Sequence, residues 1–241
     1  MNEQILNYGI NSLQDRFNYH EPLENDVVFL EAPDGMICRI IYNAGKVIIS
    51  VQNKLLDRLK VYLETIDLKT SLRNPLFYKE LLKLFEVDPD SYTLEPTDEL
   101  IENKHYNCIH SLEFVCSKEY FLPFMSVNKI TEVHRGDDGF YLEDNFGDVI
   151  YCVYEDGKQV AGSYYRPNQG KYKNTYAMQV FTRKGFRGKG YATSTASSAT
   201  ADVCEKNGIA LWVCQVENQA SINIAQRLGY IFMGAEIRII E

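Results

Sequence analysis

The feature that most constrains the fold of this 241-residue chain is a strand, loop, helix and strand sequence in its last third. A strand-like run (174–182) leads into a glycine-containing basic loop, RKGFRGKG (183–190). A stretch rich in Ala, Ser and Thr (191–207) then indicates a helix with Gly208 as its C-cap, and the apolar run IALWVCQV (209–216) indicates a strand covered on both faces. We therefore expect a right-handed β-α-β crossover that makes the two strands parallel.

The basic loop has the chemistry of a phosphate site. Gly188 and Gly190 allow the backbone to approach a ligand closely and to adopt positive φ. Successive N–H groups then converge on the start of a helix, where they favour an anion by roughly 0.3–1 kcal/mol. The cations between Arg166 and Lys189, with no acidic residue among them, add electrostatic steering. A loop that only turns the chain is the alternative, but such a turn needs only about 2–6 residues.

Two other phosphate-binding motifs fit less well. A P-loop requires Lys and then Ser or Thr after its last glycine, whereas Gly190 is followed by Tyr191. A dinucleotide site is closer, because Gly188 and Gly190 begin a G-x-G-x-x-G pattern and Glu217 ends the next strand. However, Thr193 occupies the third glycine position, and an antiparallel meander precedes the loop where a Rossmann fold has its first strand.

Two motifs in this region resemble those of the GNAT superfamily of acyl-CoA-dependent N-acyltransferases. The run RGKGYA (187–192) matches the family's pyrophosphate motif [QR]-x-x-G-x-[GA], between a strand and a helix. The run VENQAS (216–221), followed by RLGY (227–230), is similar to the second motif, E-N-x-x-S and then L-G-[FY]. The likeness covers about residues 147–241, with 111–146 as the less distinctive start of the same domain.

The resemblance implies acetyl-CoA as the cofactor. It implies that the loop holds the diphosphate, that backbone groups of two strand residues bind the pantetheine arm, and that two residues of the second motif lie beside it. The implied cofactor-binding residues are Val180, Thr182, Arg187, Gly188, Lys189, Gly190, Tyr191, Ala192, Asn218 and Ser221. A neutral amine would attack the thioester directly in a ternary complex, with the Val180 amide stabilising charge on the thioester oxygen.

The catalytic residues transfer less well. Tyr176 stands where many members carry a glutamate base, and Ala225 stands where a tyrosine acid is often found. We therefore name Glu217 or a water chain as the base and Tyr230 or another tyrosine as the acid. For Glu217, pairing with a nearby Arg is an equal alternative.

The N-terminal half of the chain has a different pattern of elements from the C-terminal half. Three short strands (27–31, 37–41 and 47–51) separated by turn residues predict a small antiparallel sheet, and helical spacing over 55–63 and from Asn74-Pro75 onwards predicts two helices. An acidic stretch with two prolines (87–104) suggests a boundary. We expect an α+β (mixed α/β) protein with an N-terminal α+β domain of unknown role (1–104) and a GNAT-like domain with a central mixed sheet (105–241).

Strands, turns and a second helix fill the rest of the GNAT-like domain. Strands at 147–155, 158–166 and 174–182 are expected to form a meander with turns at Asp156-Gly157 and at 168–170. A helix is expected from Asn218 to Leu228, ended by Gly229 and followed by a final strand.

Charge and composition exclude several classes of protein. The net charge of −8 opposes nucleic-acid binding, and no apolar run reaches the roughly 18 residues of a membrane helix. The N-terminus lacks the plan of a signal peptide, so we expect a cytoplasmic protein. The six cysteines form no C-x-x-C motif, and we expect them to be reduced and buried. His105, Cys108 and His110 are close in sequence, but no second ligand pair follows them, so we predict no metal site.

The expected function is therefore an acetyl-CoA-dependent N-acetyltransferase acting on a small-molecule amine or a peptide. A non-catalytic CoA-binding or regulatory module is the alternative, as is a glycine N-acyltransferase type that uses other acyl-CoAs. Residues 1–110 carry 18 acidic and 11 basic side chains, which would suit a cationic acceptor, although solubility explains the same charge. The sequence leaves open whether the protein is a homodimer.

Overall fold

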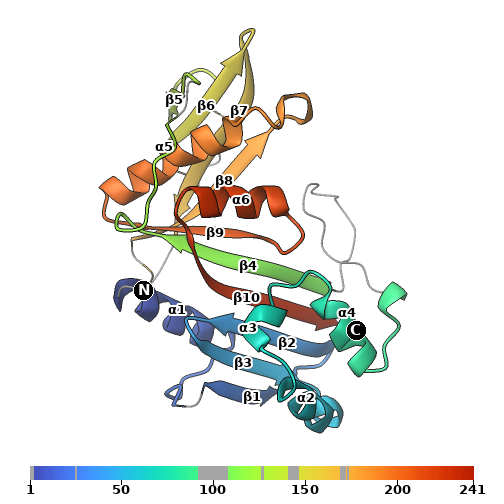
Figure 1. The fold of residues 1–241 in the computed structure, drawn as a ribbon. Coiled ribbons are helices and arrows are strands. Elements are labelled where there is room, and N and C mark those ends of the chain that lie inside the picture. Colours follow the sequence, from blue (N-terminus) through green and yellow to red (C-terminus); the bar gives the residue numbers. More distant parts are fainter. Residues whose placement is uncertain are drawn as a thin grey trace. The chain divides into compact units, whose positions relative to one another are not determined.

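The computed structural model describes residues 3–24, 26–91, 108–125, 128–140, 147–168, 172 and 174–241 (Figure 1). The chain divides into two compact units. The first unit contains Met1–Glu113, Cys214–Gln219 and Met233–Glu241, and the second contains Phe114–Val213 and Ala220–Phe232. Most of the stretch in which we expected a domain boundary lies outside the described residues, and the division at residue 104 stays a prediction.

The first unit combines a sheet with helices. Its strands follow the order β1-β3-β2-β10-β4. Its helices are α1 (Glu3–Arg16), α2 (Leu56–Leu63), α3 (Leu68–Ser71) and α4 (Phe77–Leu84), with short 3-10 turns at Asn53–Leu55 and Pro89–Ser91. Its strands are β1 (Val27–Glu31), β2 (Met36–Asn43), β3 (Lys46–Val51), and parts of β4 (Cys108–Cys116) and β10 (Ile231–Ile240).

The three N-terminal strands form where we expected them, but the sheet is not wholly antiparallel. Strands β2 and β3 pair in antiparallel register. Strand β1 pairs in parallel with β3, from Val27 opposite Val47 to Glu31 opposite Val51, so the expectation for β1 was wrong. The turn after β1 passes the end of β3 before β2 begins, and the Ala32 amide donates to the Val51 carbonyl at 3.1 Å. Strand β2 therefore does not lie next to β1 in the sheet, because β3 lies between them.

Both faces of this sheet are buried. Ile40 and Ile41 are neighbours on β2, so their side chains point to opposite faces, and both have no exposed surface. On one face, Ile41 and Ile48 pack against Leu13 of helix α1. The buried residues of α1 recur at helical spacing, from Ile5 through Tyr8 and Ser12 to Leu13, a pattern that our sequence analysis did not use.

A partly buried charge cluster also lies in the first unit. Arg16 donates to the Glu113 carboxylate at 2.5 Å, and Arg39 donates to Glu236 at 3.0 Å. Burial alone raises the pKa of Glu236, but the nearby arginine charges outweigh it and leave that pKa lowered. Burial and Glu113 raise the pKa of Tyr8. Arg16 also lies 3.8 Å from Glu236, and its carbonyl accepts from Arg39, so this cluster fixes the end of α1 against β4, β10 and β2.

The second unit contains strands in the order β9-β8-β7-β6-β5, with α5 lying across β6, β7 and β8 (Figure 1). Strands β6, β7 and β8 pair antiparallel in the expected meander, and β8 and β9 pair in parallel as the crossover requires. Its elements are β5 (Thr131–His134), β6 (Val149–Glu155), β7 (Lys158–Pro167), β8 (Thr175–Thr182), a 3-10 turn (Lys184–Phe186), α5 (Tyr191–Glu205), β9 (Ile209–Gln215, shared) and α6 (Gln219–Arg227, shared).

Two helix ends differ slightly from the predictions. At the end of α5 the left-handed residue is Asn207 (φ 54°), whose amide donates to Cys204, while the Gly208 amide donates to Val203. These two bonds form a Schellman motif, in which Gly208 takes the position after the left-handed residue. Helix α4 begins at Phe77 and not at Pro75, because residues 74–77 first form a turn.

All six cysteines are free and buried, as expected. No helix in the described part of the chain is long and apolar enough to cross a membrane. The second expected turn of the meander, at 168–170, lies largely outside the described residues; the first turn adopts positive φ at both Asp156 and Gly157, which suits a tight hairpin.

Gly229 provides a test of this fold. Its φ is +84°, and an added Cβ would lie 1.9 Å from the Tyr120 carbonyl oxygen. We expect Gly229→Ala to lower the free energy of unfolding by about 2–4 kcal/mol. Gly157→Ala is the matched control, because its φ is +72° but nothing lies within 4 Å, so it should cost about 1 kcal/mol. Equal losses in urea denaturation would contradict the close packing at Gly229.

Candidate functional site

The two parallel strands of the crossover separate soon after they begin to pair. The register between β8 and β9 covers only Thr175 to Ala177, opposite Ile209 to Leu211. Both strands continue beyond this point, β8 to Thr182 and β9 to Gln215. The later residues of β8 therefore keep β7 as a neighbour on one side and lose their ladder to β9 on the other.

The alternation of the backbone shows which groups face the separated side. The Thr175 carbonyl accepts from Asn168 and the Arg183 amide donates to Val160, so odd-numbered residues face β7. The Asn174 carbonyl accepts from Ile209, so even-numbered residues face β9. By this alternation the N–H and C=O groups of Val180 and Thr182 point to the side from which β9 has departed. These are the two residues predicted to bind an extended ligand chain.

Thr182 carries a second signal that the sequence did not reveal. Its side-chain hydroxyl oxygen is buried and has no hydrogen-bond partner in the described part of the chain. A buried polar atom without a partner is costly, and a polar group of a ligand is one way to satisfy it. This orphaned hydroxyl lies at the end of β8, directly before the basic loop.

The loop has the backbone geometry expected of the glycines. Gly188 has φ +79° and Gly190 has φ +80°, and a Cβ at either position would meet nothing within 4 Å. Gly190 is the N-cap of α5 and makes no side-chain capping bond. Phe186 anchors the loop by packing against a buried cluster that includes Val153 and Tyr191. The loop is therefore anchored to the core by Phe186, while the space next to Gly188 and Gly190 is unoccupied.

The first turn of α5 directs its amides out of the helix. Ser194 is the residue whose amide donates back to the Gly190 carbonyl, at 3.0 Å. The amides of residues 191–193 precede it and have no acceptor within a helix. Ser194 Oγ also donates to the Gly190 carbonyl and accepts from Asn128, while Ser163 and Thr195 share a hydrogen bond of 2.8 Å. These contacts hold the start of the helix in place.

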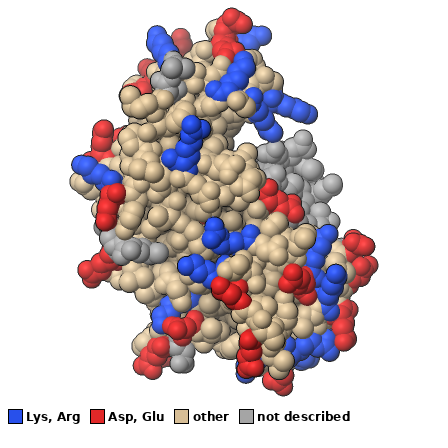
Figure 2. Space-filling model, viewed as in Figure 1, with Lys and Arg blue, Asp and Glu red and all other residues tan. Residues whose placement is uncertain are grey.

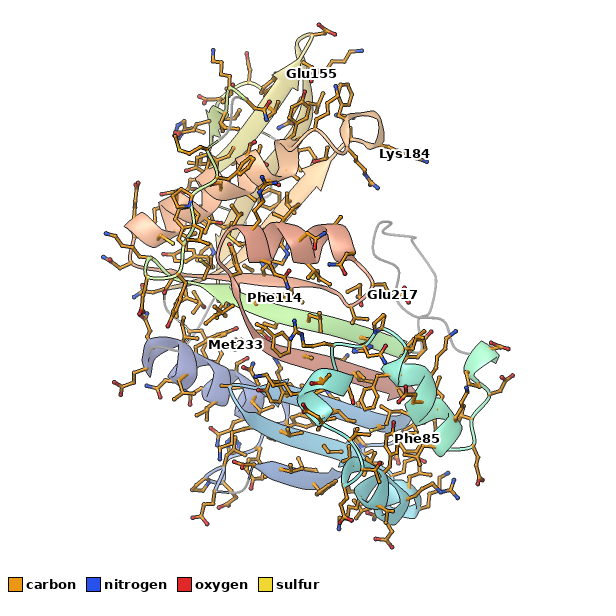
Figure 3. The ribbon with its side chains drawn as sticks, viewed as in Figure 1. Phe85, Phe114, Glu155, Lys184, Glu217 and Met233 are labelled. Carbon is orange, nitrogen blue, oxygen red and sulfur yellow. The ribbon has the colours of Figure 1, made fainter. Side chains whose placement is uncertain are left out.

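Cations surround this loop. Figure 2 shows Lys and Arg side chains in the region where Figure 1 places the connection from β8 to α5, and Figure 3 shows Lys184 extending from it. The Lys189 ammonium lies 5.1 Å from the Phe186 ring centroid and 5.6 Å from that of Tyr191. It also lies 3.4 Å from both carboxylate oxygens of Glu155. The Lys189 side chain, which belongs to the loop, is thus held by a partly exposed ion pair with Glu155.

Nine of the ten predicted cofactor residues belong to the second unit, and Asn218 belongs to the first. The Ser221 hydroxyl accepts a hydrogen bond from the Trp212 indole N–H at 2.8 Å, which fixes Ser221 on β9. The Asn218 amide donates to the Gln215 carbonyl at 3.0 Å, in the turn that follows β9. The roles of these residues in ligand binding stay predictions.

The two candidate catalytic residues have very different surroundings. Glu217 is exposed in the turn after β9. The pKa of Tyr78 is raised first by burial, and the charges of Cys108 and Glu217 raise it further. Tyr230 is 4% exposed, and its hydroxyl shares a 2.8 Å hydrogen bond with Thr200. Burial raises the pKa of Tyr230 well above its usual value. This geometry favours a packing role for Tyr230, and its role as acid stays a prediction.

The positions that usually carry the family's base and acid are occupied by packing residues. The Tyr176 ring packs edge-on against Tyr165, with centroids 5.3 Å apart, and contacts the backbone at Gly208. Ala225 is fully buried in α6. Near the N-terminal half, the His110 Nε2 atom lies 2.7 Å from the Leu72 carbonyl oxygen, which gives this imidazole a structural contact. His105 lies outside the described residues.

Comparison with known proteins identifies the family. The sequence matches the GNAT acetyltransferase family over residues 46–235. The chain belongs to this family. The match begins at the start of β3, well before the segment in which the two motifs lie. No curated protein matches the sequence.

Solved structures of the GNAT fold are similar to this one. An acetyltransferase of the GNAT family from Colwellia psychrerythraea is 11% identical with a TM-score of 0.44, over 55% of this chain and 56% of that chain. A GCN5-related N-acetyltransferase-like protein from Streptococcus suis is 14% identical with a TM-score of 0.41, over 56% and 62%. A GCN5-related N-acetyltransferase from Kribbella flavida is 14% identical with a TM-score of 0.39, over 54% and 58%. The chain thus spans less than two thirds of these three proteins.

The ion pair at the loop gives a test of its affinity for anions. We expect Lys189→Ala to weaken coenzyme A binding about threefold to fivefold, and Glu155→Gln to strengthen it about twofold, because the carboxylate competes with the ligand for the ammonium. Titration calorimetry at low salt measures both effects, and 1 M salt should diminish them. Glu205→Gln, at the opposite end of α5, is the control for the change in net charge. Weaker binding in Glu155→Gln would contradict this arrangement.

Proposed function

We propose that this protein is an acetyl-CoA-dependent N-acetyltransferase that transfers an acetyl group to an amine within a ternary complex. The observation that carries the proposal is a combination of features at the end of β8. Backbone groups of β8 face the side on which the ladder to β9 has ended. A loop follows in which two glycines have positive φ, and the first amides of α5 have no acceptor within the helix. This combination suits a ligand with an extended amide-containing arm and a diphosphate. Membership of the GNAT acetyltransferase family supports it.

The residues present fit such a cofactor. The amides of residues 188–192 and the nearby cations would hold the diphosphate, and the backbone of Val180 and Thr182 would hold the arm as an added strand. The orphaned Thr182 hydroxyl would gain a partner. When bound, acetyl-CoA supplies the activated thioester. The Val180 amide is the group placed to stabilise negative charge on an acyl oxygen.

The chemistry needs little more than positioning and one proton acceptor. Holding an amine and a thioester in one site lowers the barrier by roughly 7–11 kcal/mol in ideal cases. Glu217 is the proposed base, because its carboxylate is exposed and follows directly on β9. Its role is to accept the amine proton, directly or through water. The acceptor is a small-molecule amine or a peptide, and we expect the protein to act in the cytoplasm.

A second candidate function is a CoA-binding module without catalysis. It is favoured by the replacement of the family's base and acid positions with Tyr176 and Ala225, and by the burial of Tyr230. This module would bind acetyl-CoA with the same loop but release no thiol with any amine. An N-acyltransferase with another acyl preference, of the glycine N-acyltransferase type, is a variant of the principal proposal.

Gly190 tests where the cofactor binds. We expect Gly190→Val to weaken acetyl-CoA binding at least 100-fold, because a β-branched residue strongly disfavours φ +80° and would turn the loop amides away. Gly157→Val is the matched control: it places the same side chain at φ +72° outside the loop. This control should lose stability to a similar degree and keep its affinity. Retained affinity in folded Gly190→Val would place the cofactor elsewhere.

A thiol-release screen tests the reaction. The purified protein is given acetyl-, propionyl- or benzoyl-CoA with a panel of amines, amino acids and peptides. We expect steady turnover with acetyl-CoA and at least one amine, and a fall of at least tenfold in kcat for Glu217→Gln with unchanged acetyl-CoA affinity. Saturable acetyl-CoA binding without thiol release across the panel would favour the non-catalytic module. Absence of saturable binding at millimolar acetyl-CoA would overturn both candidates.

A further inference from the structure

The single tryptophan of the chain lies where β8 and β9 separate. The ladder between these two strands ends at Leu211 on β9, and Trp212 is the next residue. Trp212 is 3% exposed, whereas Val213, whose side chain points to the other face of the sheet, is 60% exposed. The indole therefore fills the covered face of β9 at the point where the proposed cofactor site begins.

The indole N–H bonds to one of the predicted cofactor residues. Trp212 Nε1 donates to Ser221 Oγ at 2.8 Å. Ser221 lies in the first turn of α6 and is partly exposed. An indole N–H can only donate, so the Ser221 oxygen is the acceptor in this bond. Breaking the bond would leave a buried donor without an acceptor, which is costly, so Trp212 holds the Ser221 hydroxyl against β9.

A second aromatic ring holds the indole in place. The Tyr230 ring packs edge-on against Trp212, with centroids 5.5 Å apart. The Tyr230 hydroxyl lies 2.8 Å from the Thr200 hydroxyl on α5. Thr200 Oγ1 donates its one proton to the Ala196 carbonyl at 2.7 Å, so Tyr230 must be the donor to Thr200. The Tyr230 proton is therefore engaged in packing, which favours a positioning role for this tyrosine over a role as acid.

We propose that Trp212 is a positioning residue for the cofactor site, because its indole N–H fixes the Ser221 hydroxyl beside the pantetheine arm of acetyl-CoA. The contacts form one line within the second unit, which starts on α5, crosses two aromatic rings and ends in the first turn of α6. Trp212 acts through Ser221 and takes no part in the chemical step. This inference rests on the proposed function, since it assigns Trp212 to the binding of acetyl-CoA.

A double-mutant cycle on the full chain tests whether Trp212 acts through Ser221. We expect Ser221→Ala and Trp212→Phe each to raise the acetyl-CoA Kd about fivefold in titration calorimetry. The double variant should also show a rise of about fivefold, because the indole N–H has nothing to position once the Ser221 hydroxyl is removed. A rise of about 25-fold in the double variant, as two independent effects would give, or an unchanged Kd in Trp212→Phe, would overturn the proposal.

Kinetics and a control variant separate positioning from general loosening of the unit. Trp212→Phe should raise the KM for acetyl-CoA by a larger factor than it lowers kcat. Tyr165→Phe is the matched control, because it removes a buried hydroxyl that donates to Asp202 on α5, and it should keep the acetyl-CoA Kd. An equal loss of affinity in this control would contradict the proposal. Wild-type protein without saturable acetyl-CoA binding would overturn the proposed function as well, whereas saturable binding with independent effects would overturn this inference alone.

The hydrogen bond itself is tested without the cofactor. Because the chain has one tryptophan, its indole N–H gives a single signal in NMR spectra of the ¹⁵N-labelled protein. We expect Ser221→Ala to shift this signal and to speed its exchange with D₂O by at least about tenfold. Ser198→Ala is the control, because it removes a hydroxyl on α5 that bonds to the Ser194 carbonyl, and it should leave the signal in place. An unchanged exchange rate in Ser221→Ala would overturn the proposal even if Trp212→Phe failed to fold.

Discussion

The separation of β8 from β9 is the constraint on which the candidate site depends. Parallel strands normally pair along their length, because an unpaired backbone group is costly when it is shielded from water. Here the ladder ends at Ala177, although both strands continue. The free side of β8 then leads directly into the loop at residues 183–190. In the proposed function, the surface for the extended arm of the cofactor and the surface for its phosphates would therefore follow each other along a single stretch of chain.

The first unit is held together by a different kind of interaction. Its sheet is covered on both faces by aliphatic side chains, yet the contact between α1 and the sheet contains partly buried arginines paired with glutamates. Such pairs add little net stability but are costly to break, so they favour one docking of the helix over others.

Local patterns in the sequence predicted much of the fold, and long-range packing accounts for the rest. The glycine loop, the meander and the crossover follow from spacing and turn chemistry, which act over a few residues. The parallel pairing of β1 with β3 depends on which strand edge the turn at residues 33–35 reaches, and short-range patterns do not encode this. The buried state of Tyr230 depends on Thr200 and Trp212, which are far from it in the sequence.

The packing of Tyr176 on Gly208 links two positions that the chain must change together. An added Cβ at residue 208 would lie 2.5 Å from the Tyr176 ring, so this ring fills space that only a glycine leaves open. Tyr176→Glu would remove the ring and leave a void beside the backbone, together with a carboxylate without a partner provided for it. A larger residue at 208 would clash with the Tyr176 ring, and a smaller one at 176 would leave a void beside Gly208, so the two positions would have to be changed together.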